Sequence, residues 1–342
     1  MKIAIHYYSN DFSDRWIEYC LENNIFYKRI DCYSNDIMTI MQEFDILLWS
    51  WNLGRYESLY FAKELIYALE KMGKIVFPSF NTSFLYDNKI GQKYLLEAIN
   101  APYIQTYVFY NQGVALKWAN ETTYPKVFKL SGGAGSINVK LCLNKQEAFK
   151  LINKSFGKGF SQSDRLSWFQ DKLGKFKEEM NFVSLKNLLK SCIRLFIPTE
   201  KEKMLNKDKG YIYFQEFIPN NDYDIRVIVI DKKAFALKRI CRENDFRASG
   251  SGKIEYSKHS INLDCIQVSF EVTKSINAQC MAFDFVFDEN NKPLIVEMSY
   301  HFAPYAYDEC DGYWTEKLDW VDGHVNPQYM IIESIIKNYN RL

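Results

Sequence analysis

Two acidic residues inside apolar, strand-like segments are the clearest candidates for chemistry in this sequence. Asp284 lies in the run Ala282–Phe287, and Glu297 lies in the run Leu294–Met298, with a short polar turn between the two. Burying a carboxylate costs free energy unless a cation or a metal ion compensates its charge. Two carboxylates on neighbouring strands suit Mg²⁺, which prefers hard oxygen ligands together with phosphate oxygens. Salt bridges at the strand ends are the alternative explanation.

A lysine followed by a glycine-rich loop is the second candidate. The strand-like segment Pro125–Leu130 carries Lys129 and leads into Gly132, Gly133 and Gly135. Glycines let backbone N–H groups turn toward phosphate oxygens, and a nearby lysine neutralises their charge. The Walker A spacing is not satisfied. An ordinary β-turn therefore remains the alternative.

Basic residues gathered before a Gly/Ser loop form the third candidate, in the run Leu237–Lys253. Arginines combined with loop hydroxyls and backbone amides can form an anion clamp for a transferring phosphoryl group. A solvated surface loop is the alternative.

The first 80 residues alternate between strand-like and helix-like segments, which predicts a small, open, mostly parallel sheet. No G-x-G-x-x-G follows the first strand, so a Rossmann nucleotide site is not supported. The expected strands are Lys2–His6, Phe26–Ile30, Asp45–Trp49 and Ile75–Phe77, and the expected helices are Phe12–Glu22 and Leu59–Met72, the second ending at Gly73.

The rest of the chain is expected to contain a helix over 82–98, opened by Thr82 or Ser83 and carrying Asp87 and Lys89 early. Residues 150–209 contain 14 Lys or Arg against 7 Asp or Glu, which indicates a basic, helical insertion. The further expected strands are Gln105–Tyr110, Pro125–Leu130, Tyr211–Phe217, Ile225–Asp231, Ala234–Ile240, Ala282–Phe287 and Leu294–Met298, and the further helices are Cys265–Gln279 and 326–340.

The composition is that of an ordinary globular protein. The 342 residues include 47% hydrophobic and 25% charged residues, with 43 Lys+Arg against 42 Asp+Glu, which excludes disordered and fibrous classes. The net charge of +1 gives no overall reason to expect nucleic acid or an anionic membrane as the main partner. Aromatic residues reach 16%, which fits apolar cores or a stacking surface equally well.

Targeting and cysteine patterns point to the cytoplasm. The N-terminal apolar run is too short for a signal peptide, and no stretch approaches the ~20 apolar residues needed to span a bilayer. The eight cysteines are scattered without C-x-x-C pairs, so reduced, buried thiols are expected rather than disulfides or a zinc site.

Taken in order, these segments resemble the ATP-grasp superfamily and are similar to its glutamate-adding and glutathione-synthase-type ligases. The resemblance runs from about Asp87 to Ser299. It implies an α/β (α+β) ATP-grasp fold, in which two α+β lobes clasp ATP after an N-terminal parallel-sheet platform. The implied domains are a platform at 1–85, a central lobe at 86–215 with the basic insertion at about 150–209, and a C-terminal lobe at 216–342 with the metal site.

The resemblance assigns roles residue by residue. Gln215-Glu216-Phe217-Ile218 matches the strand that holds adenine, Asp224-Ile225-Arg226 matches a triplet whose aspartate meets the ribose, and Asp245–Ser249 matches in part a phosphate-binding segment. The implied nucleotide-binding residues are Lys89, Lys129, Gln215, Glu216, Phe217, Ile218, Asp224, Arg247, Ala248 and Ser249. The implied catalytic residues are Arg226, Arg239 and Arg247. The implied metal ligands are Asp284, Glu297 and Ser299.

Serine replaces the family's asparagine at Ser249 and Ser299, and a hydroxyl is a weaker metal ligand than an amide carbonyl. A second Mg²⁺ would therefore be held more loosely or through water. The set Lys129, Asp284, Glu297 and Arg247 is present, so the resemblance still implies ATP and Mg²⁺ as cofactors.

The activity implied is that of an ATP-grasp ligase that joins a carboxylate to an amine through an acyl phosphate and produces ADP. The run DFRASGSG and the C-terminal tail look like a subgroup encoded among bacterial surface-polysaccharide genes, which suggests small, sugar-linked carboxylate and amine substrates. The alternatives are a ligase directed at a peptide or protein, and a non-catalytic nucleotide-binding module. Neither nucleic acid nor stable membrane insertion is expected, and a homodimer is one option for the oligomeric state. The identity of the substrates and the role of the basic insertion stay open.

Overall fold

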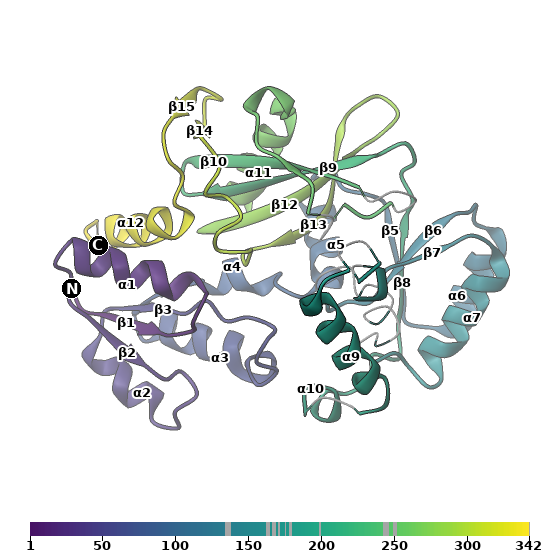
Figure 1. The fold of residues 1–342 in the computed structure, drawn as a ribbon, viewed down its shortest axis with the longest axis horizontal. Coiled ribbons are helices and arrows are strands. Elements are labelled where there is room, and N and C mark those ends of the chain that lie inside the picture. Colours follow the sequence, from purple (N-terminus) through teal and green to yellow (C-terminus); the bar gives the residue numbers. More distant parts are fainter. Residues whose placement is uncertain are drawn as a thin grey trace. The chain divides into compact units, whose positions relative to one another are not determined.

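The chain is described here by a computed structural model. The structure describes residues 1–133, 138–161, 165, 169, 172–174, 176–177, 180–197, 200–241, 246–248 and 252–341. These residues form two compact units (Figure 1). Unit 1 joins residues 1–103 with residues 220–342, and unit 2 consists of residues 104–219.

Unit 1 begins with a four-stranded parallel sheet, as the alternating pattern predicted. Its strand order is β2-β1-β3-β4, and every neighbouring pair is parallel. Gly73, with φ of +78°, follows the helix that was predicted to stop there. The elements are β1 (Ile3–His6), α1 (Phe12–Glu22), β2 (Tyr27–Ile30), α2 (Ile37–Ile40), η1 (Met41–Glu43), β3 (Ile46–Leu48), α3 (Ser58–Lys71) and β4 (Ile75–Phe77).

The single helix expected over 82–98 is wrong, because the structure has two helices there: α4 (Phe80–Phe84) and α5 (Lys89–Ala98). The Ser79 side chain caps α4 by accepting from the backbone N–H of Thr82. Asp87 adopts a left-handed φ of +54°, which interrupts the helical path. The Asn88 side chain then accepts from the N–H of Gly91 and starts α5. Lys89 is consequently the first residue of a helix instead of an early residue within a longer one.

The second sheet of unit 1 is antiparallel and has the order β13-β12-β9-β10-β14-β15, with β11 paired to β10. Helix α12 starts with Pro327 after the cap residue Asn326, as the Asn-Pro pair predicted. The elements are β9 (Tyr223–Ile230), β10 (Lys233–Ile240), β11 (Ile254–Glu255), η2 (Lys258–Ser260), α11 (Leu263–Ser275), β12 (Cys280–Phe287), β13 (Pro293–Ser299), β14 (Gly312–Thr315), β15 (Trp320–Asp322) and α12 (Pro327–Tyr339).

The two faces of this antiparallel sheet belong to different cores, because side chains alternate along each strand. Val227 and Phe283 are buried in a cluster that includes Cys265 and Ile266 of α11. Ile228 and Cys280 lie in the cluster that also contains the side chains of the parallel sheet. The two sheets of unit 1 therefore share one apolar core.

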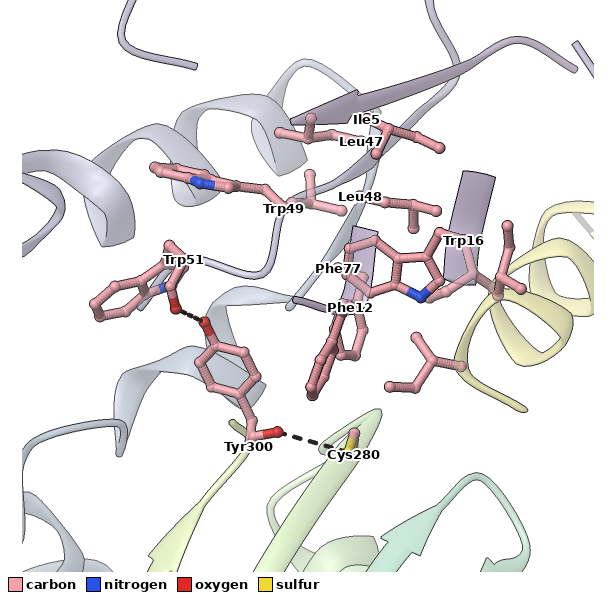
Figure 2. Packing of buried hydrophobic residues seen from close by; sticks show 14 of the residues in the cluster. Ile5, Phe12, Trp16, Leu47, Leu48, Trp49, Trp51, Phe77, Cys280 and Tyr300 are labelled. Atoms are coloured by element: carbon pink, nitrogen blue, oxygen red, sulfur yellow. Dashed lines mark hydrogen bonds between the residues drawn. The ribbon is translucent and has the colours of Figure 1, made fainter. Parts of the chain in front are cut away.

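Figure 2 shows this shared core, where Tyr300, just after β13, points toward Trp51 of the N-terminal segment. The Tyr300 hydroxyl donates to the Trp51 carbonyl oxygen, and the Cys280 thiol lies 3.8 Å from the Tyr300 carbonyl oxygen. The Phe12 and Phe77 rings complete the contact with the parallel sheet. Because Tyr300 follows the strand that carries Glu297, this packing holds the end of β13 in place.

Residues 86–103 pack within unit 1, whereas the sequence-based division placed them in the central lobe. Backbone hydrogen bonding explains the difference, since the N–H of Ile295 donates to the carbonyl of Pro102 and Tyr103 forms a bridge with Ile295. These contacts tie the segment after α5 to β13.

Unit 2 has a four-stranded antiparallel sheet in the order β5-β8-β6-β7. Its core contains Phe128 and Phe214 of the sheet, packed with Ala115, Ala148 and Ile152 of two helices. No helix among the described residues of either unit is long and apolar enough to cross a membrane. The elements are β5 (Thr106–Phe109), α6 (Gln112–Glu121), β6 (Lys126–Lys129), β7 (Lys140–Cys142), α7 (Lys145–Phe156), α9 (Phe182–Phe196), α10 (Glu200–Met204) and β8 (Ile212–Glu216).

Candidate active site

A row of charged side chains crosses three strands of the antiparallel sheet in unit 1. Glu297 on β13 is directly opposite Asp284 on β12, and Asp284 is directly opposite Arg226 on β9. Residues that oppose one another across a sheet project from the same face. The register shifts just after Asp284, because Phe285 pairs with Ile295. Asp284 therefore lies between an acid and a base on one face.

Four of the charged residues form a compact ion network. Arg226 binds Asp284 through two hydrogen bonds, from Nε to Oδ1 at 2.6 Å and from Nη2 to Oδ2 at 2.7 Å. Arg239 binds Asp224 in the same bidentate way at 2.7 and 2.5 Å, and its Nη2 lies 3.0 Å from Asp284 Oδ1. Bidentate arginine–carboxylate pairs are strong and directional. Two arginines and two aspartates balance in charge, so the network is neutral as a whole.

The network shifts the pKa values of its two carboxyl groups in opposite directions. Burial raises the pKa of Asp284, but the charges of Arg226 and Arg239 outweigh burial and hold that pKa well below its usual range. Burial and the neighbouring charge of Asp284 raise the pKa of Asp224, against the lowering effect of Arg239. Asp284 is therefore ionised at neutral pH and available as an oxygen ligand.

Lys89 reaches the same row from the first turn of α5. Its Nζ lies 2.9 Å from Oε1 of Glu297, and its side chain is 7% exposed, against 36% for Glu297. The capping of α5 by Asn88 positions this lysine, since the helix begins at Lys89. Glu297 thus faces a lysine from the helix and an aspartate across the strand pair.

Gln92 is a site residue that the sequence reasoning missed. It is 4% exposed, and its Nε2 donates to the carbonyls of Leu85 (2.9 Å) and Met298 (2.8 Å). The N–H of Met298 donates in turn to Gln92 Oε1 at 3.0 Å. Met298 stands between Glu297 and Ser299, so Gln92 fixes the backbone of the acidic strand. Its spacing of three residues from Lys89 places both on one helix face, and this is the signal by which the sequence could have revealed Gln92.

The hydroxyl of Ser299 is bonded within its own turn. It donates to the carbonyl of His301 at 2.8 Å and accepts from the N–H of His301 at 3.1 Å. The His301 ring stacks on Phe12 at 5.2 Å, and its Nε2 lies 3.5 Å from Oδ1 of Asp11, the residue that caps α1. Asp11 and His301 therefore support the turn that follows the acidic strand, a role with no signal in the sequence spacing.

The oxygen atoms of this site fit Mg²⁺ in chemistry. An ionised carboxylate offers about four acceptor positions, and the arginines take three of those on Asp284. The Glu297 side chain is about a third exposed and contacts one lysine, and the Ser299 oxygen keeps one lone pair. In the part of the chain that is described, no three His, Cys, Asp or Glu residues are grouped to hold a metal. Mg²⁺ commonly takes one or two carboxylates and fills its other positions with water and phosphate oxygens.

The predicted nucleotide-binding residues of unit 2 lie on two faces of its sheet. Lys129 Nζ donates to Gln215 Oε1 at 2.6 Å, and Val127 pairs with Gln215, so Lys129 and Gln215 share a face. Glu216 is on the opposite face, where Lys126 Nζ lies 2.6 and 2.7 Å from its two carboxylate oxygens. A nucleotide on the Lys129 face would meet the side chain of Gln215 and the backbone of the residue after it. Lys126 has a structural role that the sequence reasoning missed.

The remaining predicted residues are placed only in part. Phe217 and Ile218 follow β8 and are half-buried. Arg247 is half-buried and Ala248 is buried, whereas Ser249 lies outside the described residues, together with residues 242–245 and Gly135 of the glycine-rich loop.

The parallel sheet, the two antiparallel sheets and the charged row together give this chain an ATP-grasp fold. Within it, residues 144–302 match the RimK-like ATP-grasp domain.

Solved structures share this fold over nearly the whole chain. A D-alanine–D-alanine ligase from Bacillus anthracis, complexed with ATP, is 12% identical at a TM-score of 0.58, covering 100% of this chain and 98% of that one. A D-cycloserine synthetase is 10% identical at a TM-score of 0.59, covering 99% of each chain. A RimK domain ATP-grasp protein from Sphaerobacter thermophilus is 12% identical at a TM-score of 0.56, covering 98% of this chain and 100% of that one. No curated protein sequence matches the chain.

Proposed function

We propose that this protein is an ATP- and Mg²⁺-dependent ligase that joins a carboxylate to an amine and produces ADP. The observation that supports it best is the row Glu297–Asp284–Arg226 across three strands of an ATP-grasp fold. A row of two acids beside a base can hold a divalent cation next to an anionic substrate group. The ligase bound to ATP among the structures of this fold adds support.

We assign one group of residues to the phosphates of ATP and a second group to the substrate carboxylate. Mg²⁺, when bound by Asp284 and Glu297, would neutralise the oxygens of the transferred phosphoryl group. The phosphates would be bound by the ammonium groups of Lys89 and Lys129 and by the planar guanidinium of Arg247, which can donate two parallel hydrogen bonds. Arg226 and Arg239, which are aligned by Asp284 and Asp224, would face the substrate carboxylate and the charge that develops on it.

The proposed reaction has two steps, phosphorylation of the carboxylate and attack by the amine. A carboxylate oxygen attacks the γ-phosphorus of ATP, the bond from that phosphorus to the β–γ bridging oxygen breaks, and ADP leaves with that oxygen. The amine nitrogen then attacks the acyl carbon, loses a proton, and expels phosphate as the amide forms. Positioning and electrostatic stabilisation carry most of the rate in such phosphoryl transfer.

The substrate class we propose is a precursor of a bacterial surface polysaccharide, with a uronic acid as carboxylate or an amino sugar as amine. Its support is the resemblance of the Asp245–Gly252 run and of the C-terminal tail to proteins encoded among polysaccharide genes. A peptide or protein acceptor is the competing proposal. Cytoplasmic location and a homodimer belong to the same set of proposals.

The experiment is a turnover assay with Mg-ATP and pairs of candidate carboxylates and amines, with ADP, AMP and phosphate measured separately. ADP formed in equal amount to an amide product is expected, and chelation of Mg²⁺ should abolish it. Glu297→Gln should lose turnover, whereas Glu316→Gln, which removes the same charge from an exposed ion pair with Lys232, should not. AMP in place of ADP, or full activity in Glu297→Gln, would contradict the proposal. Amide formed only on peptides would shift the acceptor to the competing class.

A further inference from the structure

Helix α9 of unit 2 exposes several of its apolar side chains. Phe182 is 80% exposed, Leu189 is 57% exposed and Ile193 is 59% exposed. Ser184 and Ser191 of the same helix are buried at 5% and 0%. A surface helix normally buries its apolar stripe and exposes its polar one. In α9 the side that packs inward contains these two serines and the half-buried Leu188 and Leu195, while a second set of apolar side chains stays exposed.

The exposed residues form one continuous ridge. Phe182, Leu185, Leu189 and Ile193 are spaced by three and four residues, which places them along one side of a helix. Ile197 extends the ridge at the C-terminal end and is 60% exposed. Fifteen helical residues span roughly 22 Å at 1.5 Å per residue. Contiguous exposed apolar surface of this extent marks a binding surface for a protein or a membrane.

Basic residues run along one flank of the ridge. Lys186, Lys190 and Arg194 follow one another at four-residue spacing, and residues 180–197 contain neither Asp nor Glu. Lys186 and Lys190 are exposed, and neither forms an ion pair with any residue that the structure describes. The overall net charge of +1 conceals this local excess. An anionic partner is therefore complementary to the helix.

We propose that α9 binds the surface of an anionic lipid bilayer, with its axis in the plane of the headgroups. The apolar ridge would enter the boundary between headgroups and acyl chains, while Lys186 and Lys190 meet anionic headgroups. Amphipathic helices with Lys or Arg on the polar side and Phe or Leu on the other bind membranes in this way. A protruding ridge, unlike a groove, has the shape that a deformable bilayer accommodates. The helix lies on the membrane and does not cross it.

The test is sedimentation of the full-length protein with vesicles. We expect binding to vesicles that contain roughly 30% anionic phosphatidylglycerol in phosphatidylcholine, and weak binding to phosphatidylcholine alone. Raising the salt concentration from about 0.1 M to about 1 M should weaken binding, because the Debye length falls from ~10 to ~3 Å. Equal binding to both vesicle types, or none to either, overturns the proposal.

Pairs of substitutions test whether vesicle binding depends on the ridge of α9 or on nonspecific attraction between the protein and the vesicles. Lys186→Glu with Lys190→Glu should weaken binding by at least about 30-fold, since each basic residue near an anionic surface contributes ~1 kcal/mol. Leu189→Ser with Ile193→Ser should abolish it. The matched control is Val114→Ser with Lys117→Glu on α6, where both side chains are also exposed.

Circular dichroism and a thermal melt establish that each variant is folded. Loss of vesicle binding in the α6 control equal to that in the α9 variants overturns the proposal. Retained binding in folded α9 variants overturns it as well. Binding of an acidic amphipathic peptide, with no vesicle binding, would assign the ridge to a protein partner instead.

Discussion

Substituting Asp284 by asparagine tests the ion network most directly. Asp284 is 13% exposed at its side chain and accepts two hydrogen bonds from Arg226 and one from Arg239. Asparagine has almost the same shape but keeps one acceptor oxygen and presents an NH₂ group to an arginine nitrogen. The change leaves two arginines with one aspartate, Asp224. The substitution therefore removes one negative charge and one charge-assisted hydrogen bond without creating a cavity.

The expected loss of stability is large. Breaking a buried ion pair by removing one partner costs about 3–5 kcal/mol, because the other charge stays buried and uncompensated. At about 2–4 °C per kcal/mol for a domain of 150–250 residues, the melting temperature should fall by about 10 °C. Glu297→Gln should cost no more than about 1 kcal/mol, since Glu297 is more than a third exposed and has one lysine partner. Both variants should lose turnover, but the first should lose several times more stability than the second.

A double variant separates charge from packing. Arg226→Gln with Asp284→Asn leaves Arg239 paired with Asp224 and no unbalanced charge in the network. Its melting temperature, measured by calorimetry, should lie above that of Asp284→Asn alone, which is the sign of coupling in a double-mutant cycle. If Asp284→Asn melts within about 2 °C of the unsubstituted protein, the cost of a buried unpaired arginine has been overestimated. Additive losses in the double variant would contradict the charge argument.

The remaining predictions concern pH, the α5–β13 contact and the two lysines of β6. The folded-state pKa of Asp284 is lowered, so its contribution to stability is complete above the unfolded pKa of about 3.9 and is lost as the pH falls further. The loss of unfolding free energy in Asp284→Asn, measured by urea melts, should therefore stay constant from about pH 5 to 8 and shrink below about pH 4. Gln92→Ala leaves both backbone groups of Met298 without their partner and should cost about 2–3 kcal/mol in the same assay, whereas an unchanged melt would show that water replaces the amide. Lys129→Met should weaken nucleotide binding by calorimetric titration more than Lys126→Met, which should instead lower the melting temperature; the reverse order would exchange their roles.

Local pattern was sufficient to predict most elements. Short apolar runs joined by a polar turn identified β12 and β13, and the strand–helix alternation of the first 80 residues identified the parallel sheet. The helix over 82–98 failed because a left-handed Asp87 and the Asn88 cap divide it, and both depend on side-chain geometry within a few residues. Apolar periodicity across that break looks continuous, so pattern alone predicts one helix.

The residue types of the candidate site were evident from the sequence, but their partners were not. Asp284 and Glu297 were recognisable as charges inside apolar segments, and Lys89 as an early residue of an expected helix. Asp284 binds Arg226 because β12 lies beside β9, a strand about 50 residues away in the chain. Side-chain alternation along one strand does not predict which other strand pairs with it. Gln215 and Glu216 project from opposite faces because side chains alternate along a strand, but the register of β8 against β6 decides which lysine each one meets.

The sequence by itself determined most of the elements, the charged residue types and the resemblance to ATP-grasp ligases, because each depends on spacing along the chain. Only the tertiary structure decided that Gln92 holds the acidic strand, that two arginines keep Asp284 ionised, and that α9 turns its apolar ridge outward. These features arise between segments far apart in sequence. Burial and electrostatic shifts depend on which segments meet, and the local pattern of residues carries no information about that meeting.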